Sequence, residues 1–373
     1  MPELQGPSGR RLMRALYFGT YERDYPRNAQ VISCLRRAGV EVIEHHVDVW
    51  EGRRQSWRAG AGSIAALAAG ELRLLRRPRV DFDVLIVGYP GHLDLAAARR
   101  AAGERAVVFN PLVSLADTFV ADRGRFRPGS AAARVFTAID RRAFRAADLI
   151  VADTEANGRH LASLAEVPAE RVEVCLVGAE ERLFRPGWAP KEPFTCLFVG
   201  KLIPLHGLPT ILAAARAAPE VPLRLVGSGQ LEPLLRDRPA NVEWIPWVEY
   251  ERLPDELYRA GCALGIFGTS GKAHRVIPNK AFQALACGTP LITADTPAAR
   301  ELLVHEQSAL LVPPGDAQAL AAALRRLAAD PALARALSEA GQTAFREHAS
   351  EEVLGRRWRS VLERAQALRS PRR

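Results

Sequence analysis

The sequence predicts an α/β protein made of two doubly wound domains that face each other across a cleft. Short apolar runs alternate with helical stretches of roughly ten or more residues, which is the pattern of parallel strands joined by crossover helices. A Pro- and Gly-rich segment, GAEERLFRPGWAPKEP, interrupts this alternation, and a new apolar run, FTCLFVG, restarts it. We therefore expect one domain over 1–187, a second over 188–350 and a closing amphipathic helix over 351–373.

The first domain begins with the strand LMRALYFG, followed by a helix from Pro26 to Ala38 and the strand GVEVIEHH. An arginine-rich helical stretch leads to DFDVLIVG and RAVVFN, whose continuous apolar runs are typical of parallel strands buried on both faces. The strand ADLIVADT comes next, and its Asp153 and Thr154 can cap the helix that follows.

The second domain repeats the alternation. Six apolar runs predict its strands: FTCLFVG, PLRLVGSG, NVEWIPW, CALGIFG, PLITAD and SALLVPPGD. The segment DAQALAAALRRLAAD has an Asp cap and apolar residues at the helical period, which predicts a helix. Ligands of doubly wound domains bind beyond the carboxyl ends of the strands, so the site is expected where the two domains meet.

Composition indicates a globular protein of the cytoplasm. Hydrophobic residues make up 48% of the 373 residues and charged residues 25%, which argues against disorder. No apolar run approaches the roughly eighteen residues of a membrane span, and no secretory leader is recognisable. The five cysteines form no CxxC pair, so we expect reduced, buried thiols rather than disulfides or a zinc site.

The formal net charge of +9 is compatible with anionic substrates, an anionic membrane face or nucleic acid. Zinc-finger spacing, a basic recognition helix and an aromatic RNA-binding run are all absent from the sequence, so we expect no nucleic-acid partner. The stretch 57–79 combines an apolar face with arginines at its end. It predicts either a peripheral membrane face or a helix that packs on the sheet with a solvated basic edge.

Lysine is rare in this chain and unevenly placed. Only four of its 51 basic residues are lysines, and three of these, Lys201, Lys272 and Lys280, follow apolar strands of the second domain. Such positions hold phosphate in α/β proteins, and lysine supplies a compact point charge where arginine supplies a planar fork. The pattern predicts a phosphate site, with chance placement as the alternative.

Four segments together resemble the GT-B glycosyltransferases of the family-4 type over nearly the whole chain. VGKLIPLHG is similar to that family's G-R/K-x-x-P-x-K-G loop, and LRLVGSG to its L-x-x-x-G-x-G strand end. ALACGTPLITADTPAARELL is similar to the A-x-A-x-G-x-P-V-I segment, and VPAERVEVCLVGAEERLFRP to the stretch before the linker. The resemblance implies two Rossmann-like domains, with the closing helix crossing back to the first.

The chain departs from this family at a pair of glutamates spaced eight positions apart. In the family, one glutamate contacts the donor sugar and the other the ribose. Here Arg275 and Gln283 occupy those positions. Gln283 retains hydrogen-bonding capacity toward a ribose, whereas Arg275 reverses the charge. We interpret the chain as a divergent branch with a more cationic diphosphate site, and loss of activity is the alternative.

The resemblance assigns most of the donor site to the second domain. We expect Lys280 to be exposed in the cleft, and the helices that open after Pro204 and Pro278 to direct their amides at the phosphates. The loop WIPWVEY is expected to read the base. The donor diphosphate is assigned to Gly19, Lys201, His206, Arg275 and Lys280, and the nucleoside to Gly227, Trp247, Val248 and Gln283.

In the first domain, FGTYERDYPRN takes the place of the family's glycine-rich loop. Its charged residues are more than a turn requires, so we expect acceptor contact or interdomain closure from Tyr21, Arg23, Asp24 and Arg27. Asn110 stands where the family often has a catalytic histidine. His92 and Asp117 are therefore candidate bases, although a retaining reaction guided by the leaving phosphate needs none.

The expected activity is transfer of a hexose from a nucleotide-diphosphate sugar to the hydroxyl of a glycan, lipid-linked or small-molecule acceptor. No resident cofactor is expected, and we expect fixed cations to take the place of a metal ion. Asp81 and Asp83 resemble a metal-binding D-x-D motif, but they lead directly into a strand, which favours a structural role at the start of that strand. A nucleotide-sugar epimerase and a lapsed binding protein remain alternatives. A nicotinamide dehydrogenase is not expected, because no first strand is followed by G-x-G-x-x-G.

Overall fold

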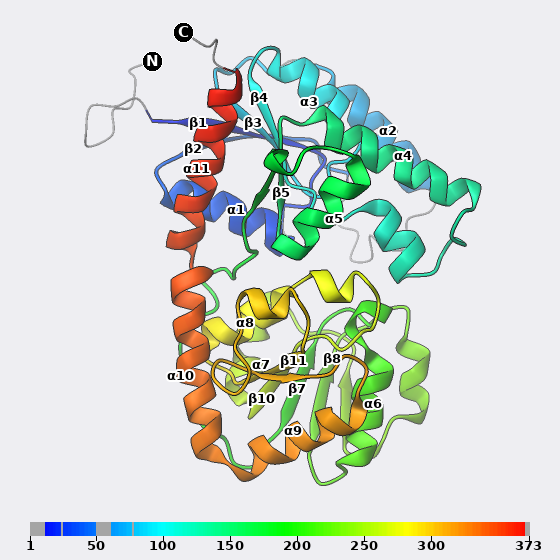
Figure 1. The fold of residues 1–373 in the computed structure, drawn as a ribbon, viewed down its shortest axis with the longest axis vertical. Helices are drawn as coiled ribbons and strands as arrows, with labels where there is room; N and C mark the ends of the chain where they lie inside the picture. The colour runs from blue at the N-terminus through cyan, green and yellow to red at the C-terminus, as the bar shows by residue number, and fades with distance from the viewer. Residues whose placement is uncertain (1–11, 24, 50–60, 77, 370–373) are drawn as a thin grey trace.

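The computed structural model describes residues 12–23, 25–49, 61–76 and 78–369. Two parallel sheets of six strands each lie one above the other, and helices cover both faces of each (Figure 1). The predicted fold class is therefore confirmed. Asp24, and residues 57–60 and 77 of the predicted basic face, lie outside the described residues.

Domain one is the unit built on the first sheet, whose strand order is β2-β1-β3-β4-β5-β6. Its strands are β1 Arg14–Gly19, β2 Glu41–His46, β3 Val84–Val87, β4 Ala106–Phe109, β5 Leu149–Ala152 and β6 Val172–Val174. Its helices are α1 Pro26–Arg37, α2 Ala61–Leu74, α3 Leu95–Ala102, α4 Ala131–Ala146 and α5 Glu155–Ala165.

Domain two is the unit built on the second sheet, in the order β12-β11-β10-β7-β8-β9. Its strands are β7 Cys196–Val199, β8 Leu223–Val226, β9 Val242–Ile245, β10 Cys262–Leu264, β11 Leu291–Ala294 and β12 Leu310–Val312. Its helices are α6 Leu208–Ala217, α7 Leu253–Arg259, α8 Asn279–Cys287, α9 Ala317–Ala329 and α10 Pro331–His348.

The helix starts follow the sequence signals. The hydroxyl of Thr154 accepts from the amide of Asn157 at 3.0 Å and caps α5. Asp316 accepts from the amides of Gln318 and Ala319, both at 2.9 Å, and caps α9. Both predicted caps are confirmed, and each satisfies amides that the first helical turn leaves without intrahelical partners.

The last helix, α11 Glu351–Arg369, leaves domain two and lies along domain one (Figure 1). It packs on α1, and its Trp358 is fully buried in the core beneath β1 and β3. Across the same sheet, a second core of Leu16, Phe18 and Leu85 faces α3 and α4. Domain one thus takes part of its core from the end of the chain.

Asp81 and Asp83 lie at the amino end of β3, opposite to the strand ends that face domain two. Asp83 accepts from the amide of Arg14 at 2.8 Å, and Asp81 pairs with the guanidinium of Arg105 at 3.1 Å. Both carboxylates therefore hold neighbouring segments together at the amino ends of the strands. Among the described residues, no three His, Cys, Asp or Glu side chains are grouped to hold a metal ion.

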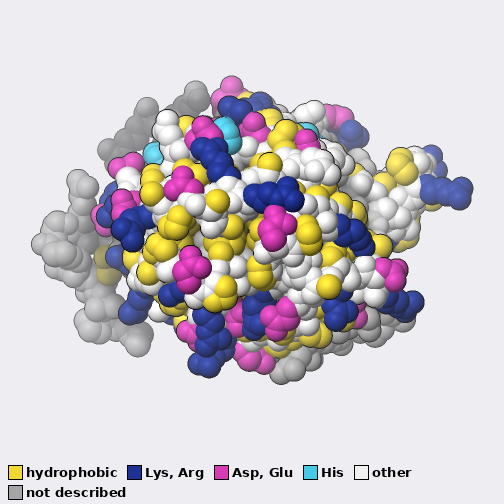
Figure 2. All heavy atoms as spheres, turned by 90° about the horizontal axis from the view of Figure 1, so that it is seen from below, with side chains coloured by type: hydrophobic (Ala, Val, Ile, Leu, Met, Phe, Trp, Pro, Cys, Tyr) yellow, Lys and Arg dark blue, Asp and Glu magenta, His cyan; other side chains and the backbone are white. Residues whose placement is uncertain are grey.

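Within the described part of the chain, no helix is both long and apolar enough to cross a membrane. Seen from below in Figure 2, domain two shows basic and acidic side chains interspersed among apolar ones. The net positive charge is thus not gathered on this face.

Candidate functional site

Two glycines bring the carboxyl ends of β7 and β8 into close contact. Gly200 and Gly227 have φ of +151° and +141°, and the Gly200 amide donates to the Val226 carbonyl at 2.9 Å. A Cβ on Gly227 would lie 2.0 Å from the Gly200 carbonyl oxygen, and one on Gly200 would lie 2.7 Å from Nζ of Lys280. Only glycine permits this approach, which places Lys280 directly beside the end of β7.

Lys280 is not the exposed cleft lysine that the sequence predicts. Its Nζ is buried without a hydrogen-bond partner in the described structure, and it lies 3.7 Å from the centroid of the Phe198 ring. The adjoining void, of about 10 Å³, is at the lower limit for one water molecule. Burial lowers the pKa of Lys280 well below its ordinary value. The free protein therefore holds an amino group without a hydrogen-bond partner at the start of α8, and burial disfavours its charged form.

The three lysines of domain two surround His206. Burial, followed by the charges of Lys280, Lys201 and Lys272, lowers the pKa of His206 well below its ordinary value, so its ring is neutral. Its Nδ1 contacts the carbonyl of Lys201. His206 therefore supplies no cation of its own and instead fixes the backbone of Lys201, whose side chain is exposed.

The helix predicted after Pro204 begins later than expected. Pro204–His206 form a short 3-10 turn, and Gly207, with φ of +71°, separates that turn from the start of α6 at Leu208. The amides of α6 therefore do not open at Pro204. The start of α8 agrees with the prediction, because Pro278 directly precedes its first residue.

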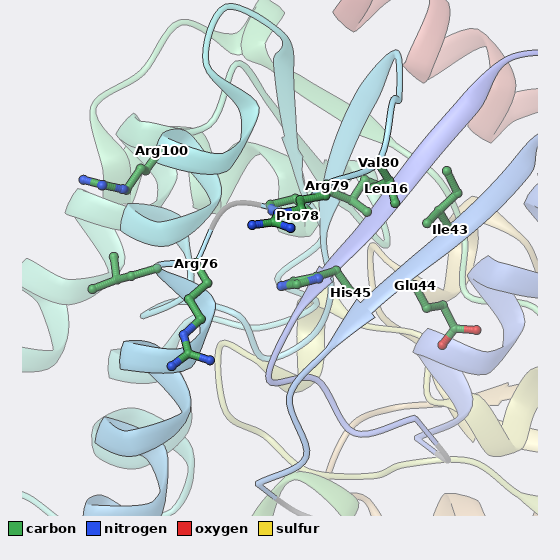
Figure 3. Close-up of a pocket in the computed structure, with 10 residues that line it drawn as sticks. Leu16, Ile43, Glu44, His45, Arg76, Pro78, Arg79, Val80 and Arg100 are labelled. Atoms are coloured by element: carbon green, nitrogen blue, oxygen red, sulfur yellow. The ribbon is translucent and has the colours of Figure 1, made fainter.

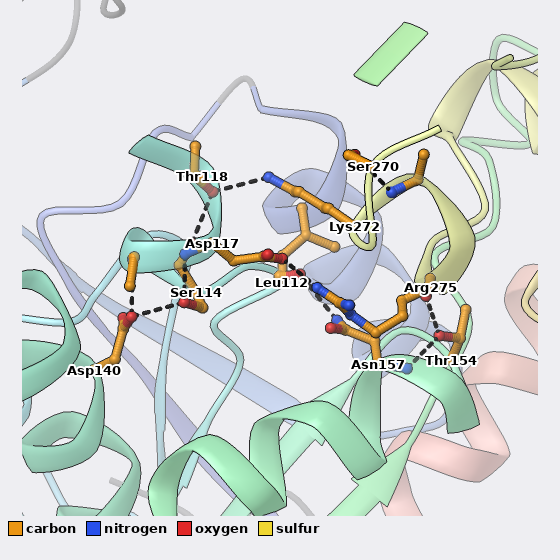
Figure 4. A network of polar contacts seen from close by, with 12 residues as sticks. Leu112, Ser114, Asp117, Thr118, Asp140, Thr154, Asn157, Ser270, Lys272 and Arg275 are labelled. Atoms are coloured by element: carbon orange, nitrogen blue, oxygen red, sulfur yellow. Dashed lines mark hydrogen bonds and ion pairs between the residues drawn. The ribbon is translucent and has the colours of Figure 1, made fainter. Parts of the chain in front are cut away.

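Arg275 reaches across to domain one. Its Nη2 lies 2.8 Å from Oδ2 of Asp117, and its carbonyl accepts from the hydroxyl of Thr154 at 2.5 Å. Nearby, Nζ of Lys272 donates to the hydroxyl of Thr118 at 2.8 Å (Figure 4). A candidate base and a candidate diphosphate ligand are thus paired with each other across the domain interface.

Asp140 fixes the turn that carries Asp117. Its carboxylate accepts from the hydroxyl of Ser114 at 2.7 Å and from the amides of Leu115 and Ala116, both at 2.9 Å (Figure 4). The backbone that precedes Asp117 is therefore fixed within domain one, and Asp117 projects from it toward Arg275 of domain two.

His92 lies behind this turn rather than at the interface. It is buried against Phe109 and Phe144, and its Nε2 is 3.3 Å from Oδ1 of Asp140. Burial lowers its pKa, so the ring is neutral. A buried, neutral ring is not placed to take a proton from an acceptor that enters from solvent.

Asn110 and Arg27 are structural partners. Both are fully buried, and Nε of Arg27 donates to Oδ1 of Asn110 at 3.0 Å. The guanidinium of Arg27 also donates to the carbonyls of Cys175 and Leu176, at 3.2 and 2.9 Å. The sequence placed Arg27 on an acceptor-side loop, whereas it belongs to α1 and ties that helix to the segment that leaves domain one.

The loop after β1 is likewise folded inward. Tyr21 is fully buried and donates to Glu44 at 2.9 Å, while Arg23 pairs with the same carboxylate at 3.2 Å. The amide of Thr20 donates to Oδ2 of Asp94 at 2.7 Å, and a Cβ on Gly19 would lie 2.1 Å from that oxygen. Gly19 therefore admits the carboxylate of Asp94, where the sequence predicted a phosphate.

The residues predicted to bind the nucleoside lie near the ends of β8 and β9. The carbonyl of Gly227 accepts from the indole of Trp244 at 2.8 Å, Trp247 is 56% exposed, and Val248 is half-buried. Gln283 is buried on α8 and lies 3.5 Å from the hydroxyl of Tyr250. Of these side chains, Trp247 is free to stack on a base.

Residues 193–330 match the family model described as glycosyl transferases group 1. Domain two belongs to this family. The resemblance found in the sequence is thus confirmed for the glycosyl transferase domain, and the match includes the Gly200–Gly227 contact and the lysines around His206.

The curated relatives are glycosyltransferases. A lipopolysaccharide core biosynthesis glycosyltransferase of Rhizobium meliloti is 30% identical over 189 residues, covering 48% of this chain and 52% of that protein. A D-inositol 3-phosphate glycosyltransferase of Thermobispora bispora is 31% identical over 220 residues, covering 52% and 50%. The chain spans about half the length of the curated relatives it matches.

Solved structures resemble the whole chain in fold. Sucrose-phosphate synthase of Thermosynechococcus elongatus aligns with a TM-score of 0.74 at 18% identity, covering 96% of this chain and 100% of that one. Anabaena HepE in complex with UDP-glucose aligns with a TM-score of 0.68 at 16% identity, covering 94% and 99%. The glycosyl transferase domain and domain one together form the GT-B fold.

Proposed function

We propose that the protein transfers a hexose from a nucleotide-diphosphate sugar to an acceptor hydroxyl. The observation that carries this proposal is the buried amino group of Lys280, which lacks a hydrogen-bond partner among the described residues. An unpaired buried charge is unfavourable unless a ligand satisfies it. Phosphate oxygens at the start of α8 would do so, and the amides of that helix start favour the same anion.

The chemistry follows from these cations. Breaking the bond between the sugar and the diphosphate develops negative charge on the leaving group, and fixed cations stabilise that charge without reorganising. Lys280 and Lys201 supply two such charges in the matched domain, so we propose turnover without a metal ion. The Anabaena neighbour was crystallised with UDP-glucose, which supports a uridine-diphosphate donor.

We propose retention of the anomeric configuration, with the leaving phosphate accepting the proton of the acceptor. This assignment is supported by the positions of the two candidate bases, His92 and Asp117, and of Asn110, which stands where the family often has a catalytic histidine. His92 is buried, Asn110 accepts from Arg27, and Asp117 is paired with Arg275. The names of the relatives, which refer to lipopolysaccharide core and amylovoran biosynthesis, support a glycan or lipid-linked acceptor.

The test is incubation of the full chain with a panel of nucleotide sugars, followed by separation of the products. Slow hydrolysis to free sugar and nucleoside diphosphate is the expected result, with transfer once an acceptor is found. Interconversion of the sugar would identify an epimerase instead. Binding with no turnover of any donor would identify a lapsed enzyme.

We also propose that the α2 side of domain one contacts an anionic membrane surface. Leu72, Leu75 and Val80 are 69%, 44% and 42% exposed there. Beside them, a cavity of about 630 Å³ is lined by Arg76, Arg79 and Arg100, which have no ion-pair partner in the described part of the chain. Figure 3 shows Glu44 turned away from these arginines, and its carboxylate is paired with Arg36 at 3.1 Å.

Sedimentation with vesicles tests this contact. Vesicles that contain phosphatidylglycerol should carry the protein down, whereas pure phosphatidylcholine should not, because each basic residue near an anionic surface contributes about 1 kcal/mol. The double variant Arg76→Gln/Arg79→Gln should lose most of this binding, and Arg335→Gln, on an exposed turn of α10, should not. Equal sedimentation of all three proteins would rule the contact out.

A further inference from the structure

One segment of domain one touches the loops that follow β8 and β10 of domain two at three points. It is the single wide turn Asp117–Asp122 together with Arg123, which ends it. Asp117 pairs with Arg275, and Thr118 accepts from Lys272, as described above. At the far end, the carbonyl of Arg123 accepts from Nε2 of Gln230 at 3.2 Å. Gln230 directly follows the Gly227–Gly229 loop, so Arg123 is held against the loop that ends β8.

The side chain of Arg123 is half-buried, and one of its donors lacks a partner at this position. Its Nε is buried without a hydrogen-bond partner among the described residues. Its guanidinium lies 5.9 Å from the centroid of the Phe119 ring, and the neighbouring Asp122 carboxylate is also buried without such a partner. A guanidinium presents five donors in a rigid fork that matches phosphate oxygens, and the unpartnered Nε leaves part of this fork available to an anionic ligand.

The charge of Arg123 acts on the lysines of domain two. Although Lys201 is exposed, partial desolvation is the largest cause that lowers its pKa; Glu22 opposes the shift, and Arg123 adds to it. Burial also lowers the pKa of Lys272, with Arg123 again adding to the shift against nearby carboxylates. Like charges from two domains are thus brought close together in the free protein. An anion between them would replace repulsion by attraction.

We propose that Arg123 is a phosphate-binding residue contributed by domain one, so that the diphosphate of the donor is held by both domains at once. This inference rests on the proposed function and adds a residue that the sequence did not single out. The ligand class is an inorganic or nucleoside diphosphate. The hydrogen bond from Gln230 holds Arg123 against domain two, so its guanidinium reaches the diphosphate site only when the two domains are in contact. Donor binding is therefore sensitive to closure of the domains.

The experiment measures affinity for pyrophosphate, UDP and uridine by calorimetry. Arg123→Gln should weaken pyrophosphate and UDP by about tenfold to a hundredfold, as expected for loss of a charge-assisted contact, and leave uridine unchanged. Arg123→Lys should recover part of the loss, because it restores the charge without the fork. Arg134→Gln, an exposed change on α4 of the same domain, is the matched control and should bind like the wild type.

The outcomes separate this inference from the proposed function. If Lys280→Met weakens pyrophosphate but Arg123→Gln does not, the donor site stands and the role of Arg123 is refuted. If the wild type binds neither pyrophosphate nor UDP, the proposed function itself fails. A merely structural role would lower the melting temperature of Arg123→Gln and weaken uridine and UDP alike, which would also refute the inference.

Discussion

Replacing Lys280 with methionine should reduce ligand affinity without reducing the stability of the free protein. A charge-assisted contact with phosphate is worth about 1.5–3 kcal/mol, and each 1.4 kcal/mol corresponds to about tenfold in Kd. UDP and pyrophosphate should therefore bind roughly 10- to 150-fold more weakly. In the free protein the lost ammonium has no hydrogen-bond partner among the described residues, so its removal leaves no described group unsatisfied.

The stability of this variant follows from two opposing contributions. The ammonium of Lys280 gains about 0.5–2 kcal/mol over the Phe198 ring, and a methionine sulfur in the same place gains about 0.3–1.5 kcal/mol. These two ring contacts nearly cancel, whereas the cost of burying a charged group, which lowers the pKa of Lys280, is absent from the methionine variant. We therefore expect an unchanged or raised melting temperature.

The pH dependence of unfolding gives this prediction a second readout. The folded pKa of Lys280 lies below its unfolded value of about 10.4, so the unfolded state binds more protons in the window between them. Lys280 lowers the free energy of unfolding by its full amount at pH values below its folded pKa, and by nothing above its unfolded pKa. Wild-type stability should therefore gain a rise with pH across this window that Lys280→Met lacks.

Calorimetric titration and thermal unfolding measure both effects. Lys191→Met, in the linker before β7, is the matched control and should alter neither affinity nor the pH profile. The reasoning is refuted if Lys280→Met unfolds at a clearly lower temperature while its affinity for UDP is unchanged, since that result would make the lysine a packing residue.

Three further predictions follow from the same site. Binding of UDP should take up protons at pH values between the lowered pKa of Lys280 in the free protein and its restored pKa in the complex; calorimetry in buffers of different ionisation enthalpy measures this, and no uptake at any pH would contradict it. Gly227→Ala should lose about 1–3 kcal/mol of unfolding free energy and most of its affinity for UDP. Gly103→Ala is the control: Gly103 has φ of +60° but open space around it, so this variant should lose only the smaller cost of its backbone conformation. Equal losses in denaturant titration would contradict the close contact of the strand ends. Turnover should persist in excess chelator, and complete loss that magnesium restores would revive a metal-assisted reaction.

The fold could be predicted from sequence because buried parallel strands are visible as apolar runs. Val84–Val87 and Leu291–Ala294 are buried at every position, and the loops after such strands are located with them. The glycines after β7 and β8 were predictable for the same reason, since backbone geometry at a strand end is a local property.

The burial and the partners of the charged side chains could not be predicted in this way. Lys280 is buried because α8 places it over Phe198, and Arg27 is buried because carbonyls at Cys175 and Leu176 accept from it. These partners are distant in the chain, and no local pattern reports them. The sequence did not single out Arg123 because Gln230, which donates a hydrogen bond to its carbonyl, belongs to the other domain. The arginines of DRGRFR were the only signal.

The packing of α11 has a consequence for the order in which the protein forms. Trp358, Leu362 and Ala365 complete a core whose other members include Tyr17 and Val31. During synthesis, domain one emerges before domain two, yet the helix that closes its core emerges after both. Until then the apolar face of α1 lacks its cover, and a nascent chain is exposed to misassembly for as long as domain two takes to be made. Domain one begins to fold first and finishes last.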